Sequence, residues 1–221
     1  MPSLGRLHLV TDTRPGRDPL TVVRAAVHAA ASVTRAARPV ASAGAGLVVQ
    51  VRVEDSASDR EAYDLAGRIV DICAPAGVTC LVNDRLHVAL AVGAAGGHVG
   101  ALDLPVAAAR RVLGPAAVLG ATAREPVTAA AAVTAGAGYL GVGPYRSTTT
   151  KDGLPDPIGL AGVRAVAGAV AVPVIAIGGV TVADVPELRA AGAYGVAVVG
   201  AVSGAADPAR ATAELLAALG C

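Results

Sequence analysis

The chain reads VVQVRVED at residues 48–55. The valines make this segment a candidate strand, while Gln50, Arg52 and Glu54 occupy every second position and so share one face of it. Polar side chains on a strand inside a protein need partners or a ligand, because burying an unpaired charge costs several kcal/mol. The segment is therefore either an ordinary solvated strand or the wall of a site.

Similar short, apolar runs recur along the chain and give eight candidate strands. They read LHLVTD (7–12), LVVQVRV (47–53), TCLVND (79–84), GGHVG (96–100), AVLGAT (117–122), YLGVGP (139–144), VPVIAIGG (172–179) and GVAVVGA (195–201). Ala-rich stretches of helical length, such as residues 59–77 and 207–220, separate them. This α/β alternation predicts a (β/α)8 TIM barrel with a single domain over residues 1–221. In such a barrel Gln50 and Arg52 are expected to point into the mouth, and the valines of the same strand to face the helices. An open doubly wound sheet is the main rival, but no Gly-rich dinucleotide fingerprint follows the first strand.

Composition excludes several function classes. Charged residues make up 16% of the chain, its net charge is +1, and it has four Tyr but no Phe or Trp, so nucleic acid is not an expected partner. The first apolar run is too short and too charged for a signal peptide or a membrane span, which predicts a cytoplasmic protein with no membrane partner. The three cysteines lack CxxC spacing and are interpreted as thiols. A homo-oligomer is left open.

Two carboxylates follow neighbouring strands. Asp84 ends the third candidate strand, and Asp103 follows the fourth, so a barrel would bring both to one mouth. Two such carboxylates repel each other unless a cation lies between them, and Mg²⁺ is the cation expected beside a bound phosphate. Capping of the following helices is the alternative for each Asp alone.

Glycine-rich turns and one long loop indicate a phosphate-bearing ligand. IGGV at 177–180 and VVGAVS at 198–203 end the last two strands, where barrels often bind phosphate through backbone N–H groups. The loop GPYRSTTTKDGLPDP at 143–157 contains Lys151, the single lysine among eighteen cationic residues. A lysine suits a diphosphate, so the loop is interpreted as a lid or a phosphate clamp rather than a plain surface loop. His98 is expected to make a hydrogen bond in the core.

Taken together, these segments resemble the thiamine phosphate synthase family, within the thiamine monophosphate synthase and thiazole tautomerase superfamily. The resemblance covers almost the whole chain and rests on LHLVTD, QVRVED, LVNDR, HVGALDLP, LGAT, GYLGVGPYRSTTTK, IAIGGV and GVAVVGAVS, in the order of the family. It implies an enzyme, a transferase of thiamine biosynthesis. Such an enzyme joins hydroxymethylpyrimidine diphosphate to thiazole phosphate and releases diphosphate with Mg²⁺.

The resemblance also implies roles for individual residues. Asp84 and Asp103 would hold Mg²⁺, and Arg52, Lys151 and Thr122 would be catalytic. The pyrimidine diphosphate would contact Gln50, Arg52, Asn83, Thr122 and Lys151. The thiazole phosphate would contact Thr148, Thr150, Gly179, Val199 and Gly200. Catalysis would then rest on positioning and electrostatics, without a covalent enzyme intermediate.

The chain departs from the family pattern at a few positions. Glu54 stands where the family has a lysine, and Arg124 replaces a histidine that follows the position of Thr122. Ala101 and Gly200 replace a usual Gln and a common Ser. Three outcomes follow: a working synthase in which Arg124 or Arg146 supplies the missing charge, a thiazole tautomerase, or a non-catalytic protein that binds thiazole phosphate.

Overall fold

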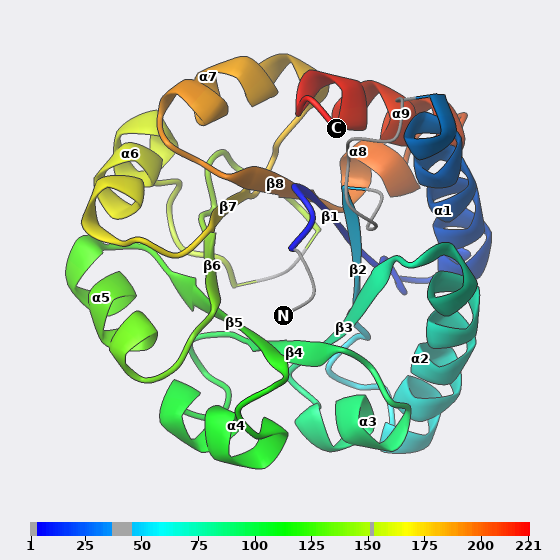
Figure 1. The fold of residues 1–221 in the computed structure, drawn as a ribbon, viewed down its shortest axis with the longest axis horizontal. Helices are drawn as coiled ribbons and strands as arrows, with labels where there is room; N and C mark the ends of the chain where they lie inside the picture. The colour runs from blue at the N-terminus through cyan, green and yellow to red at the C-terminus, as the bar shows by residue number, and fades with distance from the viewer. Residues whose placement is uncertain (1–3, 37–45, 151–152) are drawn as a thin grey trace.

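The chain folds into a closed barrel of eight parallel strands, seen in a computed structural model that describes residues 4–36, 46–150 and 153–221 (Figure 1). Each strand pairs with the next one in the sequence, and β8 pairs with β1 to close the ring. The strands are β1 (Leu7–Val10), β2 (Leu47–Val51), β3 (Thr79–Asn83), β4 (Gly96–Val99), β5 (Val118–Ala123), β6 (Tyr139–Val142), β7 (Val174–Ile177) and β8 (Gly195–Val198). The predicted TIM barrel is confirmed, and each of the eight candidate strands contains one of these strands or most of it.

Helices surround the barrel as an outer ring (Figure 1). They are α1 (Pro19–Ala36), α2 (Asp59–Cys73), α3 (Leu86–Ala91), α4 (Val106–Leu113), α5 (Pro126–Thr134), α6 (Gly159–Ala169), α7 (Val185–Ala190), α8 (Gly200–Ser203) and α9 (Pro208–Ala218), with short 3-10 turns η1 (Ala74–Ala76) and η2 (Val182–Asp184). Helices α1 and α9, the first and last helices of the described chain, pack against each other. No helix within the described ranges is both long and apolar enough to cross a membrane.

Sequence signals account for the helix limits. Helix α2 begins with a capping box in which the Ser58 hydroxyl accepts from the Glu61 N–H and the Glu61 carboxylate accepts from the Ser58 N–H. Asp207 caps α9 through the N–H of Arg210, directly before Pro208 at the first helical position. Because these caps satisfy N–H groups that the helix cannot, both helices begin at a defined residue.

The barrel interior is small and partly polar. An apolar layer of seven buried side chains fills it: Val10, Val48, Leu81, Tyr139, Ile175, Ala197 and Val199. The rings of His8 and His98 both lie next to the Tyr139 ring, with centroids 5.2 and 5.5 Å from its centroid. Gly120 on β5 leaves the room for these rings, because a Cβ there would lie 2.1 Å from Tyr139 Cζ and 2.4 Å from His98 Nδ1.

One detail of the expected β2 orientation is wrong. All its valines were expected to face the helices, but Val48 points into the barrel with Gln50, whereas Val49 and Val51 pack under the helices. The reason is the strand period of two, which puts residues 48 and 50 on the same face. The interior face of β2 therefore changes from apolar to polar as the strand approaches its carboxyl end.

We predict that Gly120→Ala destabilises the protein by about 1–3 kcal/mol, because the added methyl group would force Tyr139 and His98 to move. Urea unfolding measures the effect. The control is Gly168→Ala in α6, where a Cβ meets nothing within 4 Å. It should leave stability unchanged or raise it by up to about 1 kcal/mol, since Ala favours helix more than Gly does. Equal stabilities of the two variants would contradict this account of the interior.

Candidate functional site

The loop after β6 lies across the ends of β7 and β8. Beyond β6 the chain continues beside β7, with the N–H of Tyr145 bonded to the Ile177 carbonyl at 2.7 Å and the N–H of Arg146 to the Gly178 carbonyl at 3.0 Å. This pairing directs residues 147–150 over the two Gly-rich turns. A Cβ at Gly179 would lie 2.8 Å from the Ser147 carbonyl oxygen.

The hydroxyl-rich part of this loop meets the turn after β8. The Thr148 and Thr150 hydroxyl oxygens are 3.1 Å apart, and Thr150 Cγ2 would touch a Cβ at Gly200 at 3.7 Å. Gly179 has a φ of 64°, a conformation that favours glycine, and its surface is exposed. The structure therefore gathers four of the expected thiazole phosphate residues at one place, and buried Val199 precedes Gly200 there.

Arg52 joins this loop to the end of β2. Its Nη2 donates to the Thr150 carbonyl at 2.7 Å, and it lies 3.8 Å from Glu54 Oε1. The Arg52 side chain is 13% exposed and that of Glu54 is 42% exposed, so the guanidinium is the more enclosed partner. The charge of Arg52 is thus offset in part by the acid that replaces the expected lysine.

Asp84 and Asp103 both lie beside the end of β4. The Asp84 N–H donates to the His98 carbonyl at 2.9 Å, and Asp103 Oδ2 accepts from the Gly100 N–H at 2.6 Å. Asp84 has a φ of 64°, which is uncommon for a residue other than Gly and recurs at functional sites. The N-cap positions of α3 and α4 are Arg85 and Pro105, so neither Asp stands at the position that the capping alternative requires.

Asn83 supplies a third oxygen at this edge. Its Oδ1 is buried and has no hydrogen-bond partner within the part of the chain that the structure describes. A buried amide oxygen without a donor carries a desolvation cost that a ligand or an ion would remove. Across the described residues no cluster of three or more His, Cys, Asp or Glu could hold a metal by itself. Two carboxylates and an amide fit Mg²⁺, which usually takes one or two carboxylates and completes its shell with water and phosphate.

A chain of hydrogen bonds runs under the mouth of the barrel. Gln50 Nε2 lies 2.9 Å from His8 Nδ1 and donates to the Tyr139 hydroxyl at 2.8 Å. That hydroxyl lies 3.1 Å from His98 Nδ1, and His98 Nε2 lies 3.0 Å from Thr122 Oγ1. If the Tyr139 hydrogen goes to His98 Nδ1, then Nε2 carries the ring hydrogen and donates to Thr122. The Thr122 hydroxyl hydrogen is then available to a ligand in the mouth.

His8 forms the inner end of this chain and is neutral. Burial, together with the nearby His98, lowers the pKa of His8 from 6.5 to about 3. Burial also raises the pKa of the Tyr139 hydroxyl well above its usual range, so it stays protonated. His8 and Tyr139 are therefore uncharged near neutral pH, and both make hydrogen bonds to Gln50, which is only 4% exposed.

The two arginines expected to replace the missing lysine lie in different surroundings. Arg146 pairs with Asp184 at 2.7 Å and with Glu187 at 3.4 Å, and its guanidinium lies over the Tyr145 ring. Arg124 donates to the Asp156 carbonyl, and its Nε is buried without a hydrogen-bond partner among the described residues. Arg146 is thus already neutralised by two acids. Lys151, the remaining expected catalytic residue, lies outside the described residues.

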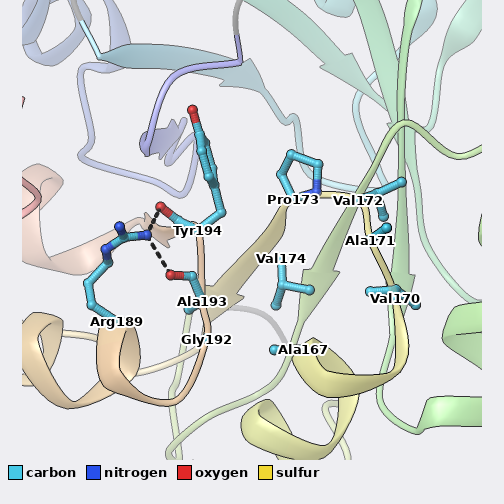
Figure 2. A pocket seen from close by; sticks show the side chains of 10 residues that line it. All are labelled: Ala167, Val170, Ala171, Val172, Pro173, Val174, Arg189, Gly192, Ala193 and Tyr194. Carbon is cyan, nitrogen blue, oxygen red and sulfur yellow. Dashed lines mark hydrogen bonds between the residues drawn. The ribbon is translucent and has the colours of Figure 1, made fainter.

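Two cavities in the described part of the chain lie at the opposite end of the barrel. One, of about 390 Å³, is lined by residues that lead into β7 and β8, and its one cationic side chain, Arg189, donates to the Ala193 and Tyr194 carbonyls at 2.7 and 2.6 Å (Figure 2). The other, of about 260 Å³, lies before β3 and β4. Barrel enzymes react at the carboxyl ends of the strands, so we place the candidate site there and not in these cavities.

Sequence reasoning missed the support under the mouth. Neither His8 nor Tyr139 was among the expected site residues, yet both make hydrogen bonds to Gln50. Both residues lie on strands rich in apolar residues, and this could have indicated buried hydrogen bonds, because a polar residue on an interior strand face needs a partner. Which residue would be that partner depends on contacts between strands far apart in the sequence. The expected core hydrogen bond of His98 is present.

Comparisons with known proteins agree on one family. The family model described as thiamine monophosphate synthase matches residues 7–202. A thiamine-phosphate synthase of Salinispora arenicola is 70% identical over 221 residues, which is 100% of both chains. One from Salinispora tropica is 68% identical over 219 residues, 99% of each chain. The solved thiamine phosphate pyrophosphorylase from Pyrococcus furiosus superposes with a TM-score of 0.81 at 30% identity, covering 97% of this chain and 95% of that one.

We predict that His8 makes the protein less stable in mild acid. Its folded-state pKa of about 3 lies below the ordinary 6.5, so between these values the unfolded chain binds a proton that the folded one refuses. The free energy of unfolding should therefore fall by about 1.4 kcal/mol per pH unit below pH 6.5 on account of this group. Urea unfolding at pH 8, 6 and 5 measures this slope.

The His8→Gln variant should have a shallower slope, whereas His87→Gln, which changes a side chain that is 63% exposed, should keep the slope of the wild type. A slope that is the same in all three proteins would mean that His8 titrates in the fold as it does in water.

Proposed function

The chain belongs to the thiamine monophosphate synthase family and acts as a thiamine-phosphate synthase, a transferase, and we propose that the mouth of its barrel joins hydroxymethylpyrimidine diphosphate to thiazole phosphate. The observation that carries the proposal is the meeting of residues 147–150 with the ends of β7 and β8. On this side of the mouth, the hydroxyl groups of Thr148 and Thr150 and the exposed backbone of Gly179 can bind a phosphate. The other half offers carboxylates, an amide and a guanidinium for a diphosphate.

In this proposal the pyrimidine diphosphate lies over β2 to β5. Arg52, Thr122 and Asn83 bind the diphosphate and the pyrimidine ring, and Lys151 adds a second cation. Gln50 contacts the pyrimidine from below, where its amide nitrogen is already fixed by His8 and Tyr139. Because the network holds Gln50 and Thr122 before substrate arrives, little ordering is needed on binding.

The leaving group requires positive charge. As the bond between the pyrimidine methylene carbon and the diphosphate oxygen breaks, negative charge develops on the diphosphate, and Arg52, Lys151 and the Thr122 hydroxyl stabilise it. Asp84 and Asp103 would hold Mg²⁺, with Asn83 nearby, and the ion when bound supplies further charge for the same diphosphate. Arg52 must exchange part of its bond to the Thr150 carbonyl for the substrate.

The acceptor lies on the opposite side. Thr148, Thr150, Gly179, Val199 and Gly200 bind the phosphate of the thiazole, which presents the ring nitrogen to the methylene carbon. That nitrogen forms the new C–N bond while diphosphate leaves, so no enzyme side chain becomes covalently attached. A single domain over residues 1–221, a cytoplasmic location and a homo-oligomer stay predictions.

We predict that the purified protein converts the two substrates into thiamine phosphate and diphosphate only when Mg²⁺ is present. Product is measured by chromatography and diphosphate release. A protein that isomerises the thiazole phosphate without joining it to the pyrimidine would be a tautomerase. One that binds thiazole phosphate regardless of Mg²⁺, with no turnover at high enzyme concentration, would be a binding protein.

In the same assay Asp84→Asn should lower kcat by about 100-fold or more, since a positioned charge that acts on the leaving group is lost. Asn tolerates the positive φ of this position, so the backbone is kept. Asp71→Asn on the exposed face of α2 removes the same charge far from the mouth and is the control. Activity of Asp84→Asn equal to that of this control would contradict the metal role.

We predict that Glu54→Lys tightens binding of the pyrimidine diphosphate by about tenfold, because a cation then replaces the acid whose Oε1 lies 3.8 Å from Arg52 Nη2 and offsets its charge. Glu54→Gln removes the acid without adding a cation and should give an intermediate affinity. Calorimetric titration with a non-reacting pyrimidine diphosphate analogue measures both. Unchanged or weaker binding of Glu54→Lys would mean that this face of β2 does not touch the diphosphate.

A further inference from the structure

Arg14, in the turn between β1 and α1, makes two sets of contacts at once. Its Nε and Nη2 donate to Asp12 Oδ1 and Oδ2 at 2.8 and 2.7 Å, a two-pronged ion pair. Its Nη1 donates to the Thr149 carbonyl, 135 residues away, at 3.1 Å. The guanidinium therefore ties the start of the barrel to the loop after β6.

Asp12 is a rigid anchor for this arginine. Its side chain is 1% exposed, and the backbone N–H of Arg14 also donates to Oδ1, at 3.3 Å. The hydrogen bonds from Arg14 lower the pKa of Asp12 below its ordinary value, so the carboxylate stays ionised near neutral pH. Asp12 thus largely neutralises the charge of Arg14. Its ion pair also fixes the position from which Arg14 Nη1 donates to the loop.

The contact falls at the centre of the hydroxyl-rich loop. Arg14 holds the carbonyl of Thr149, and Arg52 holds the carbonyl of the next residue, Thr150, at 2.7 Å. The hydroxyls of Thr148 and Thr150 lie on either side of the Thr149 peptide, 3.1 Å from each other. Two adjacent carbonyls, fixed by arginines that follow two different strands, leave this part of the loop little freedom to turn.

We propose that Arg14, clamped by Asp12, is a positioning residue that holds Thr148 and Thr150 in the arrangement that binds the thiazole phosphate. This rests on the proposed function, since it assigns the support of the same phosphate site. Arg14 acts through Thr149 and touches no substrate. Its effect is preorganisation: the loop is ordered before the phosphate arrives, so binding does not have to order it.

The first test is Arg14→Ala, with Arg17→Ala as its matched control. Arg17 pairs with the same carboxylate at 3.4 Å and is 44% exposed, and within the described part of the chain it makes no hydrogen bond to residues 147–150. In Arg14→Ala the KM for thiazole phosphate should rise by about tenfold, the worth of one charged hydrogen bond, while the KM for pyrimidine diphosphate changes less than about twofold. Arg17→Ala should change neither. Equal effects of the two variants, or equal effects on both substrates, would overturn the proposal.

Asp12→Asn separates positioning from charge and also serves if Arg14→Ala does not fold. This change frees the charge of Arg14 but removes its anchor. If Arg14 acts by positioning, the KM for thiazole phosphate rises as in Arg14→Ala. If it acts by attracting the phosphate, the KM stays the same or falls, and the proposal is wrong.

Hydrogen exchange distinguishes this proposal from the proposed function. Amides of residues 147–150 should exchange faster in Arg14→Ala than in wild type or Arg17→Ala, whether or not the protein makes thiamine phosphate. Calorimetry with thiazole phosphate alone should show the same loss of affinity. An inactive wild type would contradict the proposed function, whereas unchanged exchange and unchanged affinity in Arg14→Ala would contradict the role of Arg14.

Discussion

The pairing of β1 with β8 is the constraint on which the rest of this structure depends. Leu7 lies opposite Val196 and Leu9 opposite Val198, and this register closes eight parallel strands into a ring. Closure removes both edges of the sheet and puts the carboxyl end of every strand on one rim. Residues from β2, β4, β6 and β8 thereby face a common space, although more than half of the chain separates the first from the last.

A closed ring of eight strands encloses little volume, and this chain fills part of it with polar groups. The side chains of His8, Gln50, Tyr139 and His98 are linked by hydrogen bonds, and the absence of a side chain at Gly120 makes room for them. In a low-dielectric interior, hydrogen bonds between such buried polar groups are strong and hold the groups in place. These groups also give the mouth a rigid floor, from which Thr122 projects at the exposed end of β5.

The loop after β6, which forms one wall of the mouth, is fixed by hydrogen bonds to other parts of the barrel. Three sets of contacts fix residues 147–150. The preceding residues, Tyr145 and Arg146, pair beside β7, while Arg52 after β2 and Arg14 after β1 donate to carbonyls of the loop. The acid at position 54 is half exposed beside Arg52. At the end of β2 an acid therefore stands beside Arg52, where the resemblance led us to expect a lysine.

The sequence by itself determined the strands, the barrel and the family. Strand period, helix length and strand-end motifs are local signals, and a barrel converts their order directly into position, so the eight strands and the grouping of Thr148, Thr150, Gly179 and Gly200 could be expected. Tertiary structure alone decided which residues support them. That Tyr139 meets Gln50, that Val48 faces inward, and that Arg14 reaches Thr149 depend on strand register and on the volume left by single glycines. These contacts join residues dozens to more than a hundred positions apart, for which a linear pattern carries no signal.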